Sequence, residues 1–152
     1  MTGPDQPMAG HFTGGEHRLP VRVYYEDTDL SGVVYHANYL RYMERARSDM
    51  LREAGIDQRA AVEAGEGAYA VADLHIRYLA PARLDDALIV ASTLVEVTPA
   101  RVVIHQTVRR DAVLLAQARV VVAFVAPTGR PRRQPRGWLD IYTQLLAQGG
   151  PK

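Results

Sequence analysis

The chain has 152 residues, of which 47% are hydrophobic and 23% are charged, and it contains no cysteine. This length and composition predict one soluble globular domain with a sizeable core and exclude collagen-like, disordered and membrane-spanning chains. The formal net charge of +1 argues against a dedicated nucleic-acid binder, because such proteins use a strong positive field. Without cysteine, any chemistry must use carboxylate, imidazole, hydroxyl or backbone groups.

The two ends of the chain differ in character from its middle. Residues 1–16 are rich in glycine and proline, which predicts a flexible N-terminal tail. They lack the basic start and apolar stretch of a secretory signal, so we expect a cytoplasmic protein. No window reaches the roughly eighteen apolar residues of a spanning helix. Residues 129–152 predict a Pro/Arg-rich exit followed by a short helix over Trp138–Leu146.

The middle, residues 17–128, carries the regular patterns of a single domain. Apolar side chains alternate over Leu19–Tyr25, which predicts a strand, and a polar turn-rich block covers Glu26–Gly32. Helical spacing then runs from Asn38 to Ala54 and predicts one amphipathic helix, with a shorter helical segment over Asp57–Ala64.

Four further alternating segments follow the helices. They are Ala70–Tyr78, Ile89–Val97, Val102–Val108 and Leu114–Phe124. Because the links between them are short, we expect consecutive strands to be antiparallel neighbours. The sequence therefore predicts an α+β fold in which a five-stranded antiparallel sheet wraps around one long central helix.

One segment is specific enough to indicate a family. It reads YYEDTD over residues 24–29, GVVYHANYL over residues 32–40 and ERAR over residues 44–47. This segment closely resembles the hot-dog-fold acyl-CoA thioesterases, in particular the 4-hydroxybenzoyl-CoA thioesterase family and its Tol-Pal-associated, YbgC-type branch. The resemblance implies hydrolysis of an acyl-CoA thioester to a carboxylic acid and CoA, without metal or bound cofactor. It also implies homodimers that pair into tetramers, with active sites at the subunit interface.

The same segment suggests how such chemistry could work. Asp29 lies just before the predicted helix, whose first N–H groups have no partner and favour anions. By resemblance, Asp29 matches the catalytic carboxylate of the family, and the backbone N–H of His36 matches its oxyanion donor. The carboxylate could act as a general base on water or as a nucleophile, and the sequence leaves both routes open. The His36 imidazole could position water, polarise the carbonyl or cap the turn.

Further residues are candidates for binding the substrate. Gly32 has no Cβ and would let an acyl thioester approach the backbone. Asn38 is the expected helix cap. Glu44 is expected to lie on a polar helix face or in a buried salt bridge, although another group of hot-dog thioesterases uses a carboxylate within the central helix. Arg132 and Arg133 could pair with CoA phosphates or form a solvated exit segment. The remaining candidates for the pocket wall are Tyr25, Val33, Val34 and Tyr35.

Several other functions lack their sequence signals. No His and carboxylate spacing indicates a metal site, and there is no G-x-S-x-G elbow and no phosphate-binding glycine loop. The arginine cluster has no interleaved aromatic residues, so we expect no nucleic-acid partner. Two rival functions within the same fold stay open, namely an acyl-CoA-binding module without turnover and a dehydratase of hydroxyacyl thioesters. The intact Asp29 argues against the binding module.

Overall fold

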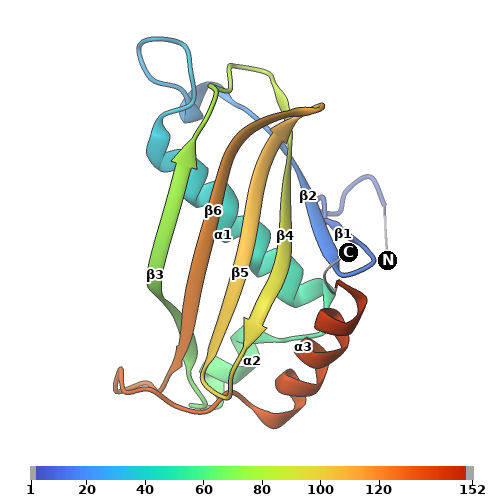
Figure 1. Ribbon diagram of the computed structural model, residues 1–152, viewed down its shortest axis with the longest axis vertical. Coiled ribbons are helices and arrows are strands. Elements are labelled where there is room, and N and C mark those ends of the chain that lie inside the picture. The colour runs from blue at the N-terminus through green and yellow to red at the C-terminus, as the bar shows by residue number, and fades with distance from the viewer. Residues whose placement is uncertain (1–2, 150–152) are drawn as a thin grey trace.

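The computed structural model describes residues 3–149 and contains one antiparallel sheet curved around a long helix (Figure 1). The elements are β1 (His11–Thr13), β2 (Glu16–Arg22), the 3₁₀ helix η1 (Tyr25–Asp27), α1 (His36–Glu53), α2 (Gln58–Glu63), β3 (Ala68–Tyr78), β4 (Ala87–Val97), β5 (Arg101–Arg110), β6 (Val113–Val125) and α3 (Arg136–Gln148). The strand order is β1-β2-β4-β5-β6-β3. The α+β prediction and the central helix are confirmed, but the sheet has six strands and not five.

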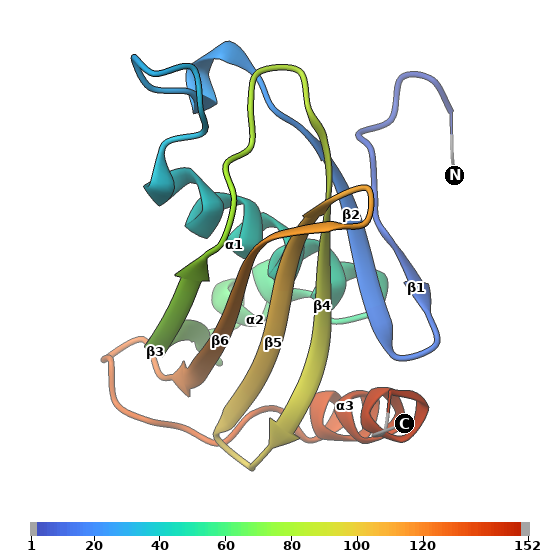
Figure 2. The ribbon, with the colours of Figure 1, turned by 45° about the horizontal axis from the view of Figure 1, so that its top comes forward.

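The additional strand is β1, which forms a hairpin with β2 at one edge of the sheet (Figure 2). Thr13 pairs with Glu16, so the loop between the strands is only Gly14-Gly15, and Gly14 has a φ of +62°. Such a Gly-Gly pair is a strong turn signal, because two-residue hairpin turns need positive φ. Part of the range predicted as a flexible tail, residues 1–16, is therefore hydrogen-bonded strand.

Helix α1 supplies one side of the hydrophobic core. Its buried apolar face packs against the concave side of the sheet and consists of Tyr39, Tyr42, Met43, Ala46, Met50 and Leu51. The helix begins at His36, two residues before the predicted start, with Tyr35 as the N-cap residue. Gly55 follows its end with a φ of +95°, which is the left-handed conformation that terminates helices.

The strand order differs from the prediction at the link between β3 and β4. These consecutive strands are not neighbours, since β3 pairs with β6 at the sheet edge while β4 lies between β2 and β5. The link over residues 79–86 therefore crosses the sheet, and it closes no hairpin. This crossing brings the link next to the segment that precedes α1, because the Val34 amide donates to the Ala82 carbonyl at 2.9 Å.

The faces of β3 and β4 also differ from the predicted alternation. A bulge between Val71 and Asp73 shifts the register of β3, so that Tyr69 and Val71 share the inner face with Leu74, in place of Ala70 and Ala72. In β4 the buried residues are Leu88, Val90, Ser92 and Leu94, which is the opposite phase to the predicted one. Both faces of β4 are apolar in sequence, so alternation alone does not decide which face is buried.

Helix α3 follows the Pro/Arg-rich segment, as predicted, and it packs against one end of the core. Its Tyr142 is fully buried, and its hydroxyl lies 2.6 Å from that of Tyr69 on β3. Tyr69 also donates to Gln134, which anchors the exit segment by donating to the Thr98 carbonyl. Over residues 3–149 no helix is both long and apolar enough to cross a membrane.

Candidate active site

The loop between η1 and α1 is folded as a small hairpin with Asp29 in its turn. The Asp29 amide donates to the Val33 carbonyl at 2.9 Å, and the Gly32 amide donates to the Asp29 carbonyl at 3.0 Å. Thr28 and Val34 form an antiparallel bridge at its base. Gly32 has a φ of +83°, a conformation that residues with a Cβ rarely adopt. The backbone thus fixes Asp29 seven residues before α1 begins.

The Asp29 carboxylate is exposed and held on one side only. Its Oδ1 atom accepts hydrogen bonds from the Ser31 amide at 2.8 Å and from the Ser31 hydroxyl at 2.5 Å. These bonds, the one from the hydroxyl first, lower the pKa of Asp29 below its ordinary value. Asp29 is therefore ionised at neutral pH. Its Oδ2 atom accepts no hydrogen bond within the described chain, so it is available to a water or a substrate.

The start of α1 is tied to η1 and leaves a backbone donor unused. The Tyr35 amide donates to the Asp27 carbonyl at 2.9 Å, and the Asn38 side-chain amide donates to the same carbonyl at 2.8 Å. Asn38 therefore connects the first helical turn to η1 and does not cap the helix as predicted. The backbone amide of His36, the first residue of α1, has no hydrogen-bond acceptor among the described residues. It belongs to the N-terminal end of the helix, where the helix dipole is positive.

The His36 side chain packs among aromatic rings. Its ring centroid lies 4.5 Å from that of Tyr35 and 6.1 Å from that of Tyr78, and the Tyr78 hydroxyl donates to the His36 carbonyl at 2.9 Å. No hydrogen bond joins this imidazole to Asp29 within residues 3–149. Tyr78 is not among the predicted site residues. It is the last residue of β3, and its hydrogen bond to His36 places this end of the strand beside the start of α1. The end of β3 therefore supports the start of α1.

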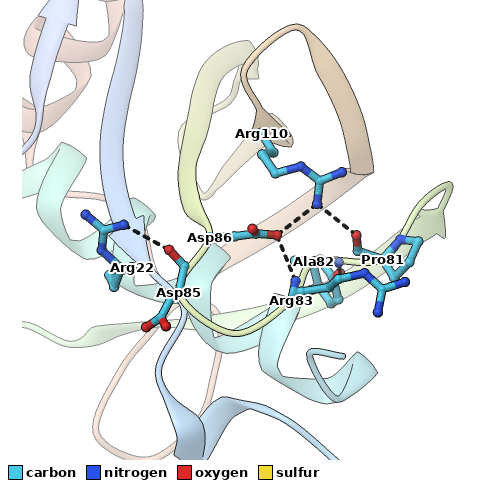
Figure 3. A network of polar contacts seen from close by, with 8 residues as sticks. Arg22, Pro81, Ala82, Arg83, Asp85, Asp86 and Arg110 are labelled. Atoms are coloured by element: carbon cyan, nitrogen blue, oxygen red, sulfur yellow. Dashed lines mark hydrogen bonds and ion pairs between the residues drawn. The ribbon is translucent and has the colours of Figure 1, made fainter. Parts of the chain in front are cut away.

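The crossing link over residues 79–86 is stiffened by the polar network in Figure 3. The Asp86 carboxylate accepts from the Arg83 amide at 2.8 Å and from the Arg110 guanidinium at 2.8 Å. The Ala82 amide donates to the Tyr39 hydroxyl at 3.0 Å, which joins the link to α1 as well. The link that receives the Val34 hydrogen bond is thus fixed to both β5 and α1.

The predicted substrate-binding residues are only partly brought together. Tyr25 is 82% exposed beside the Asp29 hairpin, Val33 and Tyr35 are accessible, and Val34 is buried in the core. Arg132 and Arg133 are not near Asp29 within one chain. Arg132 donates to the carbonyls of Gly65 and Glu66, just before β3 begins, whereas His36 lies at the end of β3. The ten residue steps of β3 separate these ends by roughly 33 Å.

In the described part of the chain, no three His, Asp or Glu side chains gather as a potential metal site. The exposed carboxylate and the unused helix amide are thus the groups that this site presents. An ionised carboxylate and a backbone N–H donor without an acceptor thus lie on one loop and the adjoining helix start.

Residues 23–140 match the model of the thioesterase-like superfamily, and the chain belongs to this family. It is 43% identical over 129 residues to the acyl-CoA thioester hydrolase YbgC of Escherichia coli, covering 84% of this chain and 96% of that protein. It is 45% identical over 107 residues to the acyl-CoA thioesterase YbgC of Haemophilus influenzae, covering 70% and 79%. Within the superfamily it is a thioesterase of the YbgC type.

A solved structure supports the same fold. The probable thioesterase of Bartonella henselae superposes with a TM-score of 0.75 at 35% identity, covering 79% of this chain and 99% of that chain. The resemblance inferred from residues 24–47 is thereby confirmed, and the sheet around α1 is the hot-dog fold.

Proposed function

We propose that the chain hydrolyses the thioester bond of an acyl-CoA and that Asp29 is the catalytic base. The observation that carries this proposal is the ionised, exposed Asp29 carboxylate held by Ser31 beside a helix start with an unused amide. The names of the YbgC relatives support the same reaction. A substrate carbonyl placed at the start of α1 would accept a hydrogen bond from the His36 amide.

The reaction balances with water as the only co-reactant. Asp29 takes a proton from a water molecule while the water oxygen bonds to the acyl carbon, and the carbonyl oxygen becomes an oxyanion. Collapse of this intermediate breaks the carbon–sulfur bond, the electron pair leaves with sulfur, and the proton passes from Asp29 to the thiolate. One well-aimed amide stabilises such an oxyanion by about 3–4 kcal/mol.

The experiment that tests this function is thiol release from a panel of acyl-CoA esters by the wild type and Asp29→Asn. Removing a positioned base lowers kcat by roughly 10²-fold or more. Glu26→Gln is the matched control, because Glu26 is an exposed carboxylate three residues away in η1. Equal rates for Asp29→Asn and the wild type would refute the role of Asp29. If the wild type bound acyl-CoA but released no thiol, the chain would be a binding module.

Pre-steady-state kinetics separates the two roles of the carboxylate. As a nucleophile, Asp29 would form a mixed anhydride and release CoA in a burst before the first acid product. In the base mechanism proposed here, thiol and acid form in equal amounts at every time, because both products come from one intermediate. A thiol burst without an equal burst of acid in the quenched reaction would replace the base mechanism by the nucleophilic one.

We further propose that two copies pair through β3 and that the site is completed across this interface. β3 is an edge strand of 11 residues, so one side of it presents unpaired backbone N–H and C=O groups, and its inward-facing Val71 is 52% exposed. Antiparallel pairing of two β3 edges about a two-fold axis brings the Arg132 end of one copy toward the Asp29 end of the other. The arginines would then reach the CoA phosphates.

Mixed dimers test this arrangement. Arg132→Ala with Arg133→Ala should raise KM with little change in kcat, as expected when uniform binding is lost. Mixing this variant with Asp29→Asn should restore low-KM turnover, because one of the two sites in each mixed dimer has all its parts. A mixture that shows only the separate activities, or a monomer in sedimentation, would contradict pairing through β3.

A further inference from the structure

A small cavity lies between α1 and the inner face of the sheet next to the β3 edge. Its volume is about 100 Å³, which is enough for several water molecules or a small polar group, and it opens to solvent beside the exposed Glu44 and Val71. Its walls are apolar where Leu51, Val71 and Ile104 contribute, and polar where Arg47, Ser48 and Glu44 contribute. An apolar cavity with a few convergent polar groups is typical of a small-molecule site.

Arg47 is the unusual member of this wall. Arg47 is only 9% exposed, yet no carboxylate of the described chain lies within 4 Å of its guanidinium. It donates one hydrogen bond, to the Gln106 side-chain oxygen at 2.9 Å. Gln106 is itself fixed, because its side-chain nitrogen donates to the Met43 carbonyl at 3.0 Å and to the Ser92 hydroxyl at 2.9 Å.

A buried guanidinium normally has a charged partner, because burying an unpaired charge is costly. Arg47 has five N–H donors and uses one within the described residues. Burial lowers the pKa of Arg47, although Glu44 opposes this shift, but an arginine stays charged at neutral pH. Arg47 thus presents spare charged donors at the wall of a cavity whose carboxylate among the described residues, that of the exposed Glu44, makes no ion pair with it.

The cavity and the candidate active site both lie between α1 and β3. Tyr78, the last residue of β3, contacts His36, and Val71 and Leu51 line the cavity farther along the two elements. Along α1, residues 44–47 lie about 12–17 Å from His36. An acyl group of that length that runs along α1 from a thioester at its start would end at the cavity.

We propose that this cavity receives the far end of the acyl group and that Arg47 selects acyl chains ending in a carboxylate. The substrates would be mono-CoA thioesters of dicarboxylic acids, and the inference rests on the proposed thioesterase function. A carboxylate fits the planar guanidinium and supplies a directly hydrogen-bonded counter-charge, which Arg47 does not have among the described residues. The exposed Glu44 carboxylate at the rim opposes this binding, but solvent weakens its effect.

The test compares pairs of CoA esters of equal chain length, one ending in a carboxylate and one in a methyl group. The measured quantity is the ratio of kcat/KM for the two members of each pair. Arg47→Gln should lower this ratio at least about tenfold, since it removes one partner of a buried charge pair. Arg52→Gln, an exposed arginine on the same helix, is the matched control and should leave the ratio unchanged.

A second variant is expected to change the same kcat/KM ratio in the opposite direction. It replaces an exposed residue, so its folding does not depend on whether the core accepts a substitution. Glu44→Gln removes a like charge near the bound carboxylate and should raise the ratio roughly two- to fivefold. If all four proteins hydrolyse both esters with the same ratio, the Arg47 proposal is wrong while the thioesterase function stands.

If the wild type hydrolyses no ester, the proposed thioesterase function is wrong. The role of Arg47 in the cavity is then tested separately, by measuring ligand binding. The probes are then thioether analogues of CoA, which cannot be hydrolysed, with a carboxyalkyl or an alkyl chain of equal length. The wild type should bind the carboxyalkyl thioether at least about tenfold more tightly than the alkyl one. Equal affinities in calorimetry would overturn the role of Arg47.

Discussion

Asp49 on α1 offers the sharpest test of how the helix is held against β1 and β2. Its Oδ2 atom accepts from His17 Nε2 at 2.7 Å and from the Gly10 amide at 2.9 Å, and Asp49 and His17 are only 6% and 0% exposed. Asp49→Ala leaves the buried His17 donor and the part-buried Gly10 amide without an acceptor. Each buried donor left unsatisfied costs about 1–3 kcal/mol, so we expect a loss of about 2–4 kcal/mol in all. In a domain of this size the melting temperature should fall by roughly 4–16 °C.

The assay is urea unfolding followed by circular dichroism and by the fluorescence of Trp138, the single tryptophan. Asp49→Asn keeps a neutral acceptor and should cost about 1–2 kcal/mol. Glu53→Ala, an exposed carboxylate at the end of the same helix, should stay within about 0.5 kcal/mol of the wild type. A loss below about 1 kcal/mol for Asp49→Ala would refute the reasoning, because the pair would then add little to stability.

Three further results are expected. Ser31→Ala removes the hydroxyl that lowers the pKa of Asp29, so the acid limb of the pH profile of kcat/KM should move to higher pH; an unmoved limb would separate Ser31 from the base. Gly32→Ala should cost about 1–2 kcal/mol in thermal unfolding, because its φ of +83° disfavours a Cβ, whereas Gly137→Ala, with open space and no such φ, should not destabilise. Dialysis against EDTA should leave thiol release unchanged, since water and Asp29 suffice for the proposed step; inactivation reversed by a metal would contradict it.

The sequence predicted the elements better than their arrangement. The amphipathic spacing from Asn38 to Ala54 found α1 because one apolar stripe determines both the helix and its buried face. The predictions of which strand face is buried are wrong for β3 and β4, where no single apolar stripe marks that face. The extra residue of the β3 bulge exchanges the two faces within the strand, and β4 is apolar on both faces. The Gly14-Gly15 turn was a readable signal for β1 that the tail prediction missed.

The candidate site shows the same division between local and distant information. Asp29, Gly32 and His36 lie so close in the sequence that their segment alone predicted a turn and, after it, the start of a helix. Arg47 did not stand out, because an arginine on an amphipathic helix is normally solvated, and only Gln106 and Ser92 from two other strands show that it is buried. Tyr78 became a site neighbour through the crossing link, which neither alternation nor link length indicates.

Helix α1 combines two requirements that conflict in an isolated helix. Its first amide must stay without a partner to bind an oxyanion, yet an unsatisfied helix end weakens the helix. Hydrogen bonds on both sides of that amide hold the helix start in place. Tyr35 and Asn38 both donate to the Asp27 carbonyl, and Tyr78 holds the His36 carbonyl. The His36 amide is thus held in a fixed position by the contacts around it. Because the net charge of the chain is only +1, recognition of an anionic substrate must depend on such local donors.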